Sequence, residues 1–441
     1  MIEQMNDNNW YQKSILLKLG VITLLILLLL IPSSWILDLI AERQDFQAQN
    51  INNVSNNWSG SQSIQGPVLV LPYTTNAAPL VANQPAQTGY VYILPDAISI
   101  KAGLDTELYK KGLYDVTVYN SKVALQGTFG QPDLNKLGIT AAQVQYDKAR
   151  LIFGISDLKG LKNNPSVAVA GQSQIAELLS DGDTLFNNAL QVTFTLPQGG
   201  PITFNYNLDL KGSNDFNFLH TAKTTDVEMS GNWPSPVFNG RNLPDSREVT
   251  KQGFKAKWHL LSYNRPFPQQ WVNDVYKLKN AKAVTQATSG VKLQVAVDEY
   301  HKITRTTKYA TLIILLTFVS LFLTELIRKQ SIHNFNYILI GAAMIVYYTL
   351  LLSFAEKIGF GLAYLIASVS TIALISVFTG SLLGSAKPAA MFAAILTTFY
   401  GFIYIMIQLE DYALLVGSIA LFVIVAIIMY FSRKINWDTH Q

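Results

Sequence analysis

The chain has 441 residues, of which 49% are hydrophobic and only 14% are charged, whereas about 25% of the residues of a soluble protein are charged. Its net charge of +4 comes from scattered residues without a basic run, which argues against a nucleic-acid-binding protein. Cysteine is absent, and its absence excludes disulfides, cysteine-ligated zinc, iron–sulfur clusters and a thiol nucleophile.

A long apolar run begins at Leu16 and predicts a membrane anchor near the N-terminus. The run continues past Pro32 to Ile40, and is therefore longer than the apolar region of a signal peptide, about 7 to 15 residues. No small-residue cleavage site follows, so an uncleaved anchor is favoured over a cleaved signal. We expect the span to kink at Pro32 or to end soon after it. Residues 1–40 are assigned to a cytoplasmic N-terminus and a first transmembrane helix.

Residues 41–308 contain no spanning segment and are predicted to form a large, exported, mainly-β domain. Short runs with apolar residues at every second position, such as Ile202–Leu210, are typical of half-buried strands. Many such runs separated by turns favour a sandwich-like pair of packed sheets.

Four shorter stretches of this region receive local interpretations. Gln198–Pro201 and Lys211–Asn214 have the composition of hairpin turns. Pro132–Val144 and Gln172–Leu179 are predicted to be helical. The polar segment Glu42–Gln65 is interpreted as a helical or irregular connector that the domain does not need for folding.

Five apolar segments of roughly 20 residues follow, each long enough to cross a hydrocarbon core of about 30 Å. Their approximate bounds are Tyr309–Ile327, Phe335–Phe354, Phe360–Leu383, Pro388–Ile407 and Tyr412–Phe431. The predicted fold class is a polytopic α-helical membrane protein with six transmembrane helices, one N-terminal and five C-terminal, and a mainly-β domain between helix 1 and helix 2. Residues 309–434 are assigned to the five-helix bundle and residues 435–441 to a cytoplasmic tail.

Basic residues decide the expected orientation. Outside the predicted domain they are Lys13, Lys18, Arg328, Lys329, Lys357, Lys387, Arg433 and Lys434. If the N-terminus is cytoplasmic, all of them except Lys357 lie on the cytoplasmic side, and positive charge in short loops favours that side. The prediction is a multi-pass protein of the bacterial inner membrane with both termini in the cytoplasm and the large domain in the periplasm.

No residue is assigned a catalytic, cofactor-binding or metal-binding role. The densest polar cluster is His220 with Asp215, Asp226 and Glu228, and it suggests a metal or acid–base site. His220 lacks a second histidine at ligand spacing, so a surface or hairpin-turn role is favoured instead. The motifs of serine hydrolases and of phosphate-binding loops are absent from the sequence.

Two further groups of residues have a structural and a functional interpretation. The tryptophans could stack on a sugar, but scattered tryptophan in a β domain is more often core; they are Trp58, Trp233, Trp258 and Trp271. In the predicted bundle, small residues at a spacing of four favour close helix packing; they are Ser376, Gly380 and Gly384.

Glu325 is the one acidic residue inside an apolar span. An ionisable group within a membrane suggests function, for instance in a proton relay. However, Glu325 lies near the end of its predicted helix, with Arg328 and Lys329 at i+3 and i+4, so an interfacial ion pair on one helix face is favoured. On that interpretation, glutamine at position 325 leaves the protein nearly unchanged.

In its order of anchor, exported β domain and five helices, the chain resembles the CreD family of bacterial inner-membrane proteins. Several strings carry the resemblance, among them Gly66-Pro67, Asn232-Trp233-Pro234-Ser235-Pro236, Thr307-Lys308-Tyr309-Ala310, Phe354-Ala355-Glu356 and Arg433-Lys434-Ile435-Asn436-Trp437. It implies a non-enzymatic protein produced under a CreB/CreC-type two-component system and linked to envelope integrity and to tolerance of some colicins and β-lactams. No catalytic or ligand residues follow from it.

Three classes of function are weighed. The favoured one is a non-enzymatic envelope protein without a cofactor, with the lipid bilayer and envelope proteins or cell-wall components as partners and no nucleic acid. The second is a transporter or a lipid- or glycan-handling protein, although the spans lack paired charges and an inverted repeat. The third is a membrane-tethered periplasmic hydrolase, for which the sequence offers no nucleophile or metal constellation.

Overall fold

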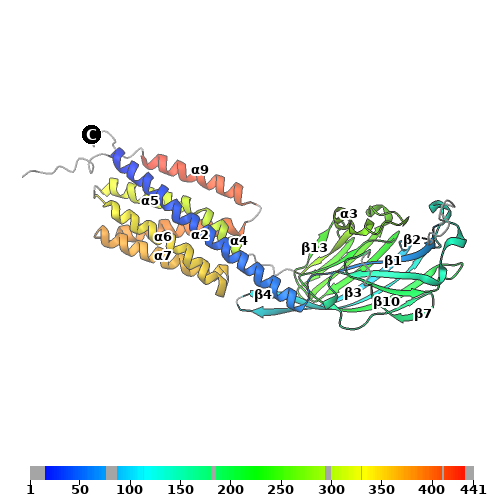
Figure 1. Ribbon diagram of the computed structural model, residues 1–441. Coiled ribbons are helices and arrows are strands. Elements are labelled where there is room, and N and C mark those ends of the chain that lie inside the picture. Colours follow the sequence, from blue (N-terminus) through cyan, green and yellow to red (C-terminus); the bar gives the residue numbers. More distant parts are fainter. Residues whose placement is uncertain are drawn as a thin grey trace, which may run out of the picture. The chain divides into compact units, whose positions relative to one another are not determined.

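The structure is a computed structural model that describes residues 15–75, 87–112, 114–179, 185–293, 299–328, 330–409 and 412–432 (Figure 1). The chain forms two compact units. One, here called the helical unit, consists of Met1–Gln47 and Val297–Gln441, and the other, the β unit, of Ala48–Ala296. The β unit thus lies within the predicted domain, residues 41–308: it begins later and ends earlier.

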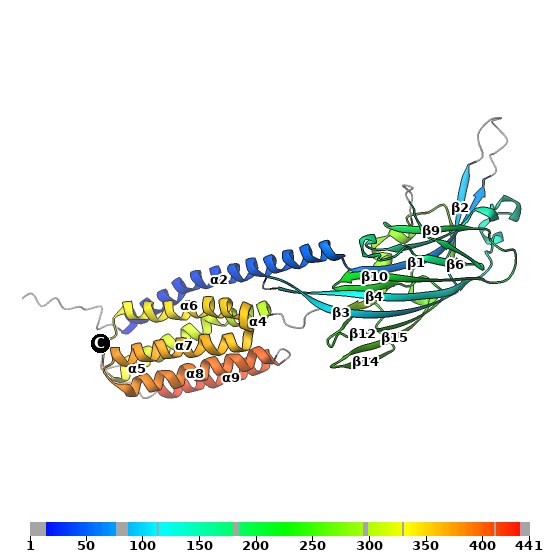
Figure 2. The ribbon, with the colours of Figure 1, turned by 90° about the horizontal axis from the view of Figure 1, so that it is seen from below.

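The β unit is a sandwich of two sheets, as predicted (Figure 2). Sheet A has the order β13 (Val237–Gly240), β17 (Thr288–Lys292), β11 (Asp215–Leu219), β1 (Gln62–Thr74), β5 (Ala149–Ile155), β9 (Ala189–Phe194) and β8 (Glu177–Leu178), with β2 (Thr88–Ile93) joining β1 to β16 (Gln270–Val272). Sheet B has the order β14 (Ser246–Thr250), β15 (Gly253–Leu261), β12 (Thr224–Gly231), β3 (Ala97–Lys111), β4 (Tyr114–Phe129), β10 (Ile202–Ser213), β6 (Ser166–Val169) and β7 (Gln172–Ile175).

The sandwich core follows from period-2 alternation. In β10, the side chains of Ile202, Phe204 and Tyr206 are buried, whereas those between them are exposed. Tyr206 stacks on Phe153 of β5 with ring centroids 4.6 Å apart, which joins the two sheets across the core. Because alternate residues point to opposite faces, the same strands leave a polar outer face on sheet B.

Two predicted hairpin turns are wrong. Gln198–Pro201 lies between β9 and β10, and Lys211–Asn214 lies at the end of β10 before β11. Since β9 and β11 belong to sheet A and β10 to sheet B, both segments carry the chain from one sheet to the other. Asn214 has a φ of 62°, a left-handed conformation that asparagine tolerates and that turns the chain abruptly.

Neither predicted helix of this region forms an α-helix. Gln172–Leu179 contains strands β7 and β8, which pair with β6 and β9 respectively, so pairing with neighbouring strands overrides the local preference. Pro132–Val144 contains only the short 3-10 turns Asn135–Leu137 and Ala141–Gln143. Among the described connections of the sandwich, the one α-helix is α3 (Ala281–Ala287).

The N-terminal helix α2 runs without interruption from Ile15 to Trp58. Pro32 lies inside it, so the expectation that the helix ends soon after Pro32 is wrong. The Ser33 hydroxyl donates a hydrogen bond to the Leu29 carbonyl at 3.0 Å, the usual local bond of a hydroxyl in an apolar helix. Exposed leucines such as Leu27 give this part of α2 an apolar outer surface.

The last residues of α2 belong to the β unit. Val54 is buried against Val116 and Val118 of β4, and Trp58 packs on the same cluster. The Asp157 carboxylate accepts hydrogen bonds from the Ser59 hydroxyl at 3.0 Å and from the Gly60 amide at 2.9 Å. The interpretation of Glu42–Gln65 as a connector that the domain does not need is therefore wrong.

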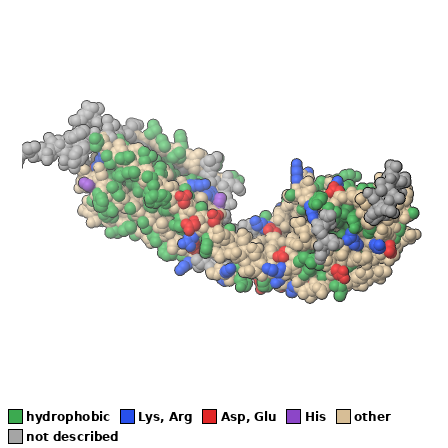
Figure 3. Space-filling model, in the orientation of Figure 1, with side chains coloured by type: hydrophobic (Ala, Val, Ile, Leu, Met, Phe, Trp, Pro, Cys, Tyr) green, Lys and Arg blue, Asp and Glu red, His purple; other side chains and the backbone are tan. Residues whose placement is uncertain are grey.

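The helical unit contains α4 (Glu299–Lys308), α5 (Ala310–Arg328), α6 (Asn334–Ile358), α7 (Phe360–Leu382), α8 (Ala386–Gln408) and α9 (Ala413–Ser432). Within the described residues, five helices are long and apolar enough to cross a membrane: α2, α4 with α5, α6, α7 and α8. Helix α9 stands in the place of the sixth predicted span, and hydrophobic side chains cover much of the visible face of this unit (Figure 3). The predicted fold class is confirmed.

Helix α4 is amphipathic and packs onto the other helices of this unit. Its residues Tyr300 and Ile303 are buried in the hydrophobic core of the bundle. The Tyr300 hydroxyl donates a hydrogen bond to Glu356 Oε1 at 3.0 Å. The segment before Tyr309, which the sequence assigns to the exported domain, is thus part of the helical unit.

Candidate functional site

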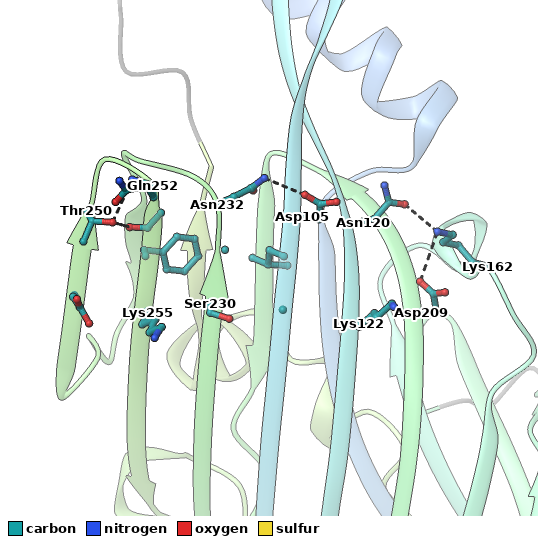
Figure 4. Close-up of a pocket in the computed structure, with 16 residues that line it drawn as sticks. Asp105, Asn120, Lys122, Lys162, Asp209, Ser230, Asn232, Thr250, Gln252 and Lys255 are labelled. Carbon is teal, nitrogen blue, oxygen red and sulfur yellow. Dashed lines mark hydrogen bonds and ion pairs between the residues drawn. The ribbon is translucent and has the colours of Figure 1, made fainter.

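An open groove of about 820 Å³ crosses the outer face of sheet B (Figure 4). Strands β3, β4, β10, β12, β14 and β15 contribute to it, and Leu104 and Phe254 lie in its floor. Its polar lining includes Asp105, Asn120, Lys122, Asp209, Glu248 and Lys255.

Strand alternation and one glycine explain the shape of the groove. Lys101, Gly103 and Asp105 are successive outward positions of β3, and Gly103 leaves the middle of this row without a side chain. A Cβ atom added at Gly103 would meet no atom within 4 Å. The groove is therefore open above Gly103, with charged residues on both sides of the opening.

Side-chain contacts fix two parts of the rim. Asn232 donates to Asp105 Oδ1 at 3.0 Å and accepts from the Thr106 amide at 2.7 Å, which ties β12 to β3. On the other side, Lys162 donates to Asn120 Oδ1 at 3.2 Å and lies 3.8 Å from Asp209 (Figure 4). These contacts hold polar groups in place before any ligand arrives.

Three charged side chains of the groove remain available. Lys122, Lys255 and Glu248 are exposed, and their charged groups have no hydrogen bond or ion pair with the residues that the structure describes. The groove thus offers two ammonium groups and one carboxylate over a floor with apolar patches. This arrangement suits a ligand that carries both carboxylate and ammonium or amide groups.

The polar cluster suggested by the sequence does not assemble. Asp226 pairs with His259 at 2.6 Å, Glu228 with Lys257 at 3.3 Å, and Asp215 accepts a hydrogen bond from Ser61 at 3.2 Å. Each carboxylate thus has a different partner, and the three do not converge on one point. In the part of the chain that the structure describes, no group of three His, Cys, Asp or Glu residues could hold a metal ion.

His220 is fully buried, so its interpretation as a surface residue is wrong. Its Nε2 donates to the Leu261 carbonyl at 2.8 Å, and its Nδ1 accepts from the Thr225 hydroxyl at 2.8 Å. Burial lowers the pKa of His220 to about 4, because the charged imidazolium would lose its hydration. A neutral histidine with both nitrogens occupied is a structural link between strands.

The tryptophans do not form a sugar-binding platform. Trp258 and Trp271 are buried, and their indole nitrogens donate to the carbonyls of Asn242 and Asp274 at 3.1 and 2.8 Å. Trp58 and Trp233 are half-buried and pack on hydrophobic clusters of the β unit. The interpretation of these residues as core is confirmed.

Glu325 is buried in the helical unit and forms an ion pair with Lys18 of α2. It also accepts a hydrogen bond from the Tyr337 hydroxyl at 3.2 Å, while Lys18 donates to the Ile332 carbonyl at 2.9 Å. The predicted partner Arg328 is exposed, and Lys329 lies outside the described residues. Glu325 is thus a paired residue, as favoured from the sequence, but its partner comes from another helix and the pair is buried.

The groove was not predicted from the sequence. Its signal was the row of Lys101, Gly103 and Asp105, in which a glycine interrupts the charged outward positions of a strand. That row becomes part of a groove only because β12 lies beside β3, with β15 and β14 beyond it, and these strands form the other side.

Comparison with known proteins gives one consistent match. A family model described as "Inner membrane protein CreD" matches residues 14–438. A protein of Escherichia coli (strain K12), also described as "Inner membrane protein CreD", is 27% identical over 421 residues, which cover 93% of this chain and 91% of that protein. The match therefore includes both the helical unit and the β unit.

Proposed function

The chain belongs to the CreD family of inner membrane proteins, and from this membership and the groove we propose that it is a non-enzymatic receptor for a component of the cell envelope. The proposal places the protein under a CreB/CreC-type two-component system, with roles in envelope integrity and in tolerance of some colicins and β-lactams. The available charges of the groove are the observation that carries it.

A non-enzymatic role is supported by the way in which the polar residues of the β unit are used. His220 and Asp226, the residues that the sequence offered for acid–base chemistry, are occupied by contacts between strands. The groove residues Lys122, Lys255 and Glu248 belong to three different strands, and an extended row of charges suits binding better than bond cleavage at one point.

We assign the groove to a cell-wall polymer. Peptide-substituted glycan carries carboxylates, ammonium groups and amides, which complement the two lysines, Glu248 and the neighbouring asparagines. A groove that is open to solvent accepts a segment of a long polymer. Such a surface, fixed at its rim by Asn232 and Lys162, requires little rearrangement on binding.

Tryptophan at position 103 is expected to block the groove and to lower cell-wall binding at least about tenfold, a loss of about 1.4 kcal/mol. The position lies in an extended strand with open space above it, so the side chain protrudes into the groove without disturbing the core. The measurement is co-sedimentation of the purified full-length protein in detergent with isolated cell-wall sacculi.

Ala124→Trp is the matched control for Gly103→Trp. Ala124 is exposed on the adjacent strand β4 and pairs with Lys101, but it does not line the groove. The control protein should bind sacculi like the wild type, and its gene should restore β-lactam tolerance to a deletion strain, whereas Gly103→Trp should not. Equal binding by both variants, or capture of an envelope protein in place of sacculi, would refute the assignment.

The proposed orientation has both termini in the cytoplasm and the β unit in the periplasm. Lys18 and the Ile332 carbonyl are in contact, so the start of α2 and the α5–α6 connection lie at one end of the helical unit. Lys357 lies at the opposite end of α6. This agrees with the distribution of basic residues; four of those residues lie outside the described part, namely Lys13, Lys329, Arg433 and Lys434.

Alkaline phosphatase fused after Gly231 should be active, because this enzyme folds only outside the cytoplasm, and the same enzyme fused after Lys387 should be inactive. Activity is normalised to the amount of fusion protein on an immunoblot. Activity of the Lys387 fusion would mean that the α7–α8 connection lies in the periplasm, which would contradict the proposed membrane topology.

A further inference from the structure

Strands β3 and β4 continue past the end of sheet B as a two-stranded ribbon (Figure 2). The pairing of β3 with β12 ends at Leu104, and that of β4 with β10 ends at Val118. Beyond these positions, residues 108–111, here called the ribbon tip, pair with no described strand other than β4. A two-stranded hairpin is marginally stable in water, so the tip gains stability from a surface that covers it.

The ribbon tip combines apolar and basic side chains. Leu108 and Tyr109 are 47% and 49% exposed, and Lys110 and Lys111 are exposed as well. Lys110 pairs in register with Asp115, but neither lysine forms a hydrogen bond or ion pair with the residues that the structure describes. The tip therefore presents two large hydrophobic groups together with two available ammonium groups.

Asn214 shows from which end of the β unit the ribbon projects. Its amide donates to the carbonyl of Thr117, next to the base of the ribbon, at 3.1 Å. Its side chain donates at 3.1 Å to the hydroxyl of Ser55 in α2, through which the chain enters the β unit. Its carbonyl accepts at 2.7 Å from the amide of Leu293, directly after β17, where the chain leaves the β unit. The ribbon thus projects from the end at which the chain both enters and leaves.

Both chain connections of this end are short. The apolar run of α2 ends at Ile40, and the β unit begins at Ala48. On the other side, the β unit finishes at Ala296, and the apolar helix α5 begins at Ala310. Chain length alone therefore keeps this end of the β unit close to the surface of a membrane.

The composition of the ribbon tip fits the surface of a phospholipid bilayer. Tyrosine is enriched at the boundary between hydrocarbon and water, where its ring has apolar and its hydroxyl polar surroundings. A neighbouring lysine reaches the lipid phosphates while its methylene groups stay in contact with apolar groups. Lysine is depleted at the centre of protein–protein interfaces, so a second protein is the less suitable partner.

We propose that the ribbon tip is a contact with the membrane surface, in which Leu108 and Tyr109 enter the interfacial layer of the bilayer and Lys110 and Lys111 bind lipid phosphates. The β unit thereby has a third attachment to the membrane, in addition to its two chain connections. This attachment restricts rotation of the β unit about the connections, and with it the direction in which the groove of sheet B faces. The proposal does not depend on the ligand of the groove.

A single introduced cysteine tests the contact, since the chain has no cysteine of its own. Tyr109→Cys is labelled with a polarity-sensitive fluorophore, and the full-length protein is placed in nanodiscs that hold one chain each. Phospholipids with a nitroxide near the headgroup should quench most of the emission, because the label lies in the interfacial layer. A second copy of the chain cannot cause this quenching in such discs.

Tyr263→Cys is the matched control. Tyr263 is 93% exposed and follows Leu261 of β15. Leu261 aligns through Thr224 of β12 with Ala97, the residue of β3 farthest from the ribbon tip. The label at position 263 therefore lies at the opposite end of sheet B, and nitroxide lipids should leave its emission unchanged.

The lysines are tested in the protein labelled at position 109. Lys110→Glu with Lys111→Glu should reduce the quenching, because phosphates repel carboxylates. Lys101→Glu with Lys148→Glu changes the net charge equally at exposed positions outside the tip and should leave the quenching as it is.

Three results would overturn the proposal. The first is emission at position 109 that nitroxide lipids do not quench, even if it is shifted to the blue, since a protein surface would then cover the tip. The second is equal quenching at positions 109 and 263. The third is quenching that persists in full after the exchange of Lys110 and Lys111.

Discussion

Glutamine in place of Glu325 is expected to destabilise the helical unit by about 3 to 5 kcal/mol. The change leaves the Lys18 ammonium without its countercharge. The loss is costly because the Lys18 side chain is only 14% exposed, so water cannot replace the carboxylate. The Ile332 carbonyl remains as its acceptor, which does not neutralise the charge. Unfolding of the purified full-length protein in detergent, followed by far-ultraviolet circular dichroism, measures the loss.

Two variants separate this explanation from others. Arg328→Gln changes the partner expected from the sequence and should have little effect, since Arg328 is exposed. Lys18→Met combined with Glu325→Leu should recover much of the lost stability, because replacement of a whole buried pair by apolar groups is often neutral. If Glu325→Gln proves as stable as the wild type, the buried pair does not hold α2 on α5.

Acid is expected to weaken the β unit through His220. Its pKa is about 4 in the folded protein and about 6.5 when unfolded, so between these values the unfolded chain binds more protons. Stability therefore falls as the pH drops from about 6.5 to about 4, by on the order of 3 kcal/mol in total. Denaturant titrations at several pH values, followed by tryptophan fluorescence, measure this slope.

His220→Gln should remove most of this pH dependence, even if the variant is less stable throughout, since an amide does not titrate. His259→Gln is the control. The bond to Asp226 raises the pKa of the exposed His259, so its contribution has the opposite sign and is lost as the pH rises. A His220→Gln protein that keeps the full slope would show that another group is responsible.

The fold was predictable from local patterns. Apolar segments of bilayer length predicted the helices from α5 to α9, and alternation such as that of Ile202–Leu210 predicted strands. Both signals work because each residue's environment there depends on the face or the span to which it belongs. The small residues of α7 also predicted close helix packing, and at Gly380 this is what the structure shows: a Cβ atom added there would lie only 2.8 Å from the Cβ of Ala389 in α8. Gly384 has a different role, because its φ of 60° turns the chain after α7.

The sequence predictions that proved wrong concern residues whose structure depends on segments distant in the sequence. Gln172–Leu179 is extended because β6 and β9 are adjacent, and Gln198–Pro201 crosses between sheets because β9 and β10 belong to different sheets. His220 is buried by strands that the sequence did not place around it. A pattern within one segment contains no information on such neighbours, and for that reason the groove was also missed.

The pair of Lys18 and Glu325 has a consequence for biosynthesis. The two residues are separated by 307 positions, with the whole β unit between them. The ribosome synthesises α2 long before α5, so the nascent α2 carries Lys18 before its partner Glu325 has been synthesised. During synthesis Lys18 must stay at the aqueous boundary, and α2 can settle in its final place only after the β unit has left the ribosome. Assembly of the helical unit around this pair is therefore a late step in the folding of the protein.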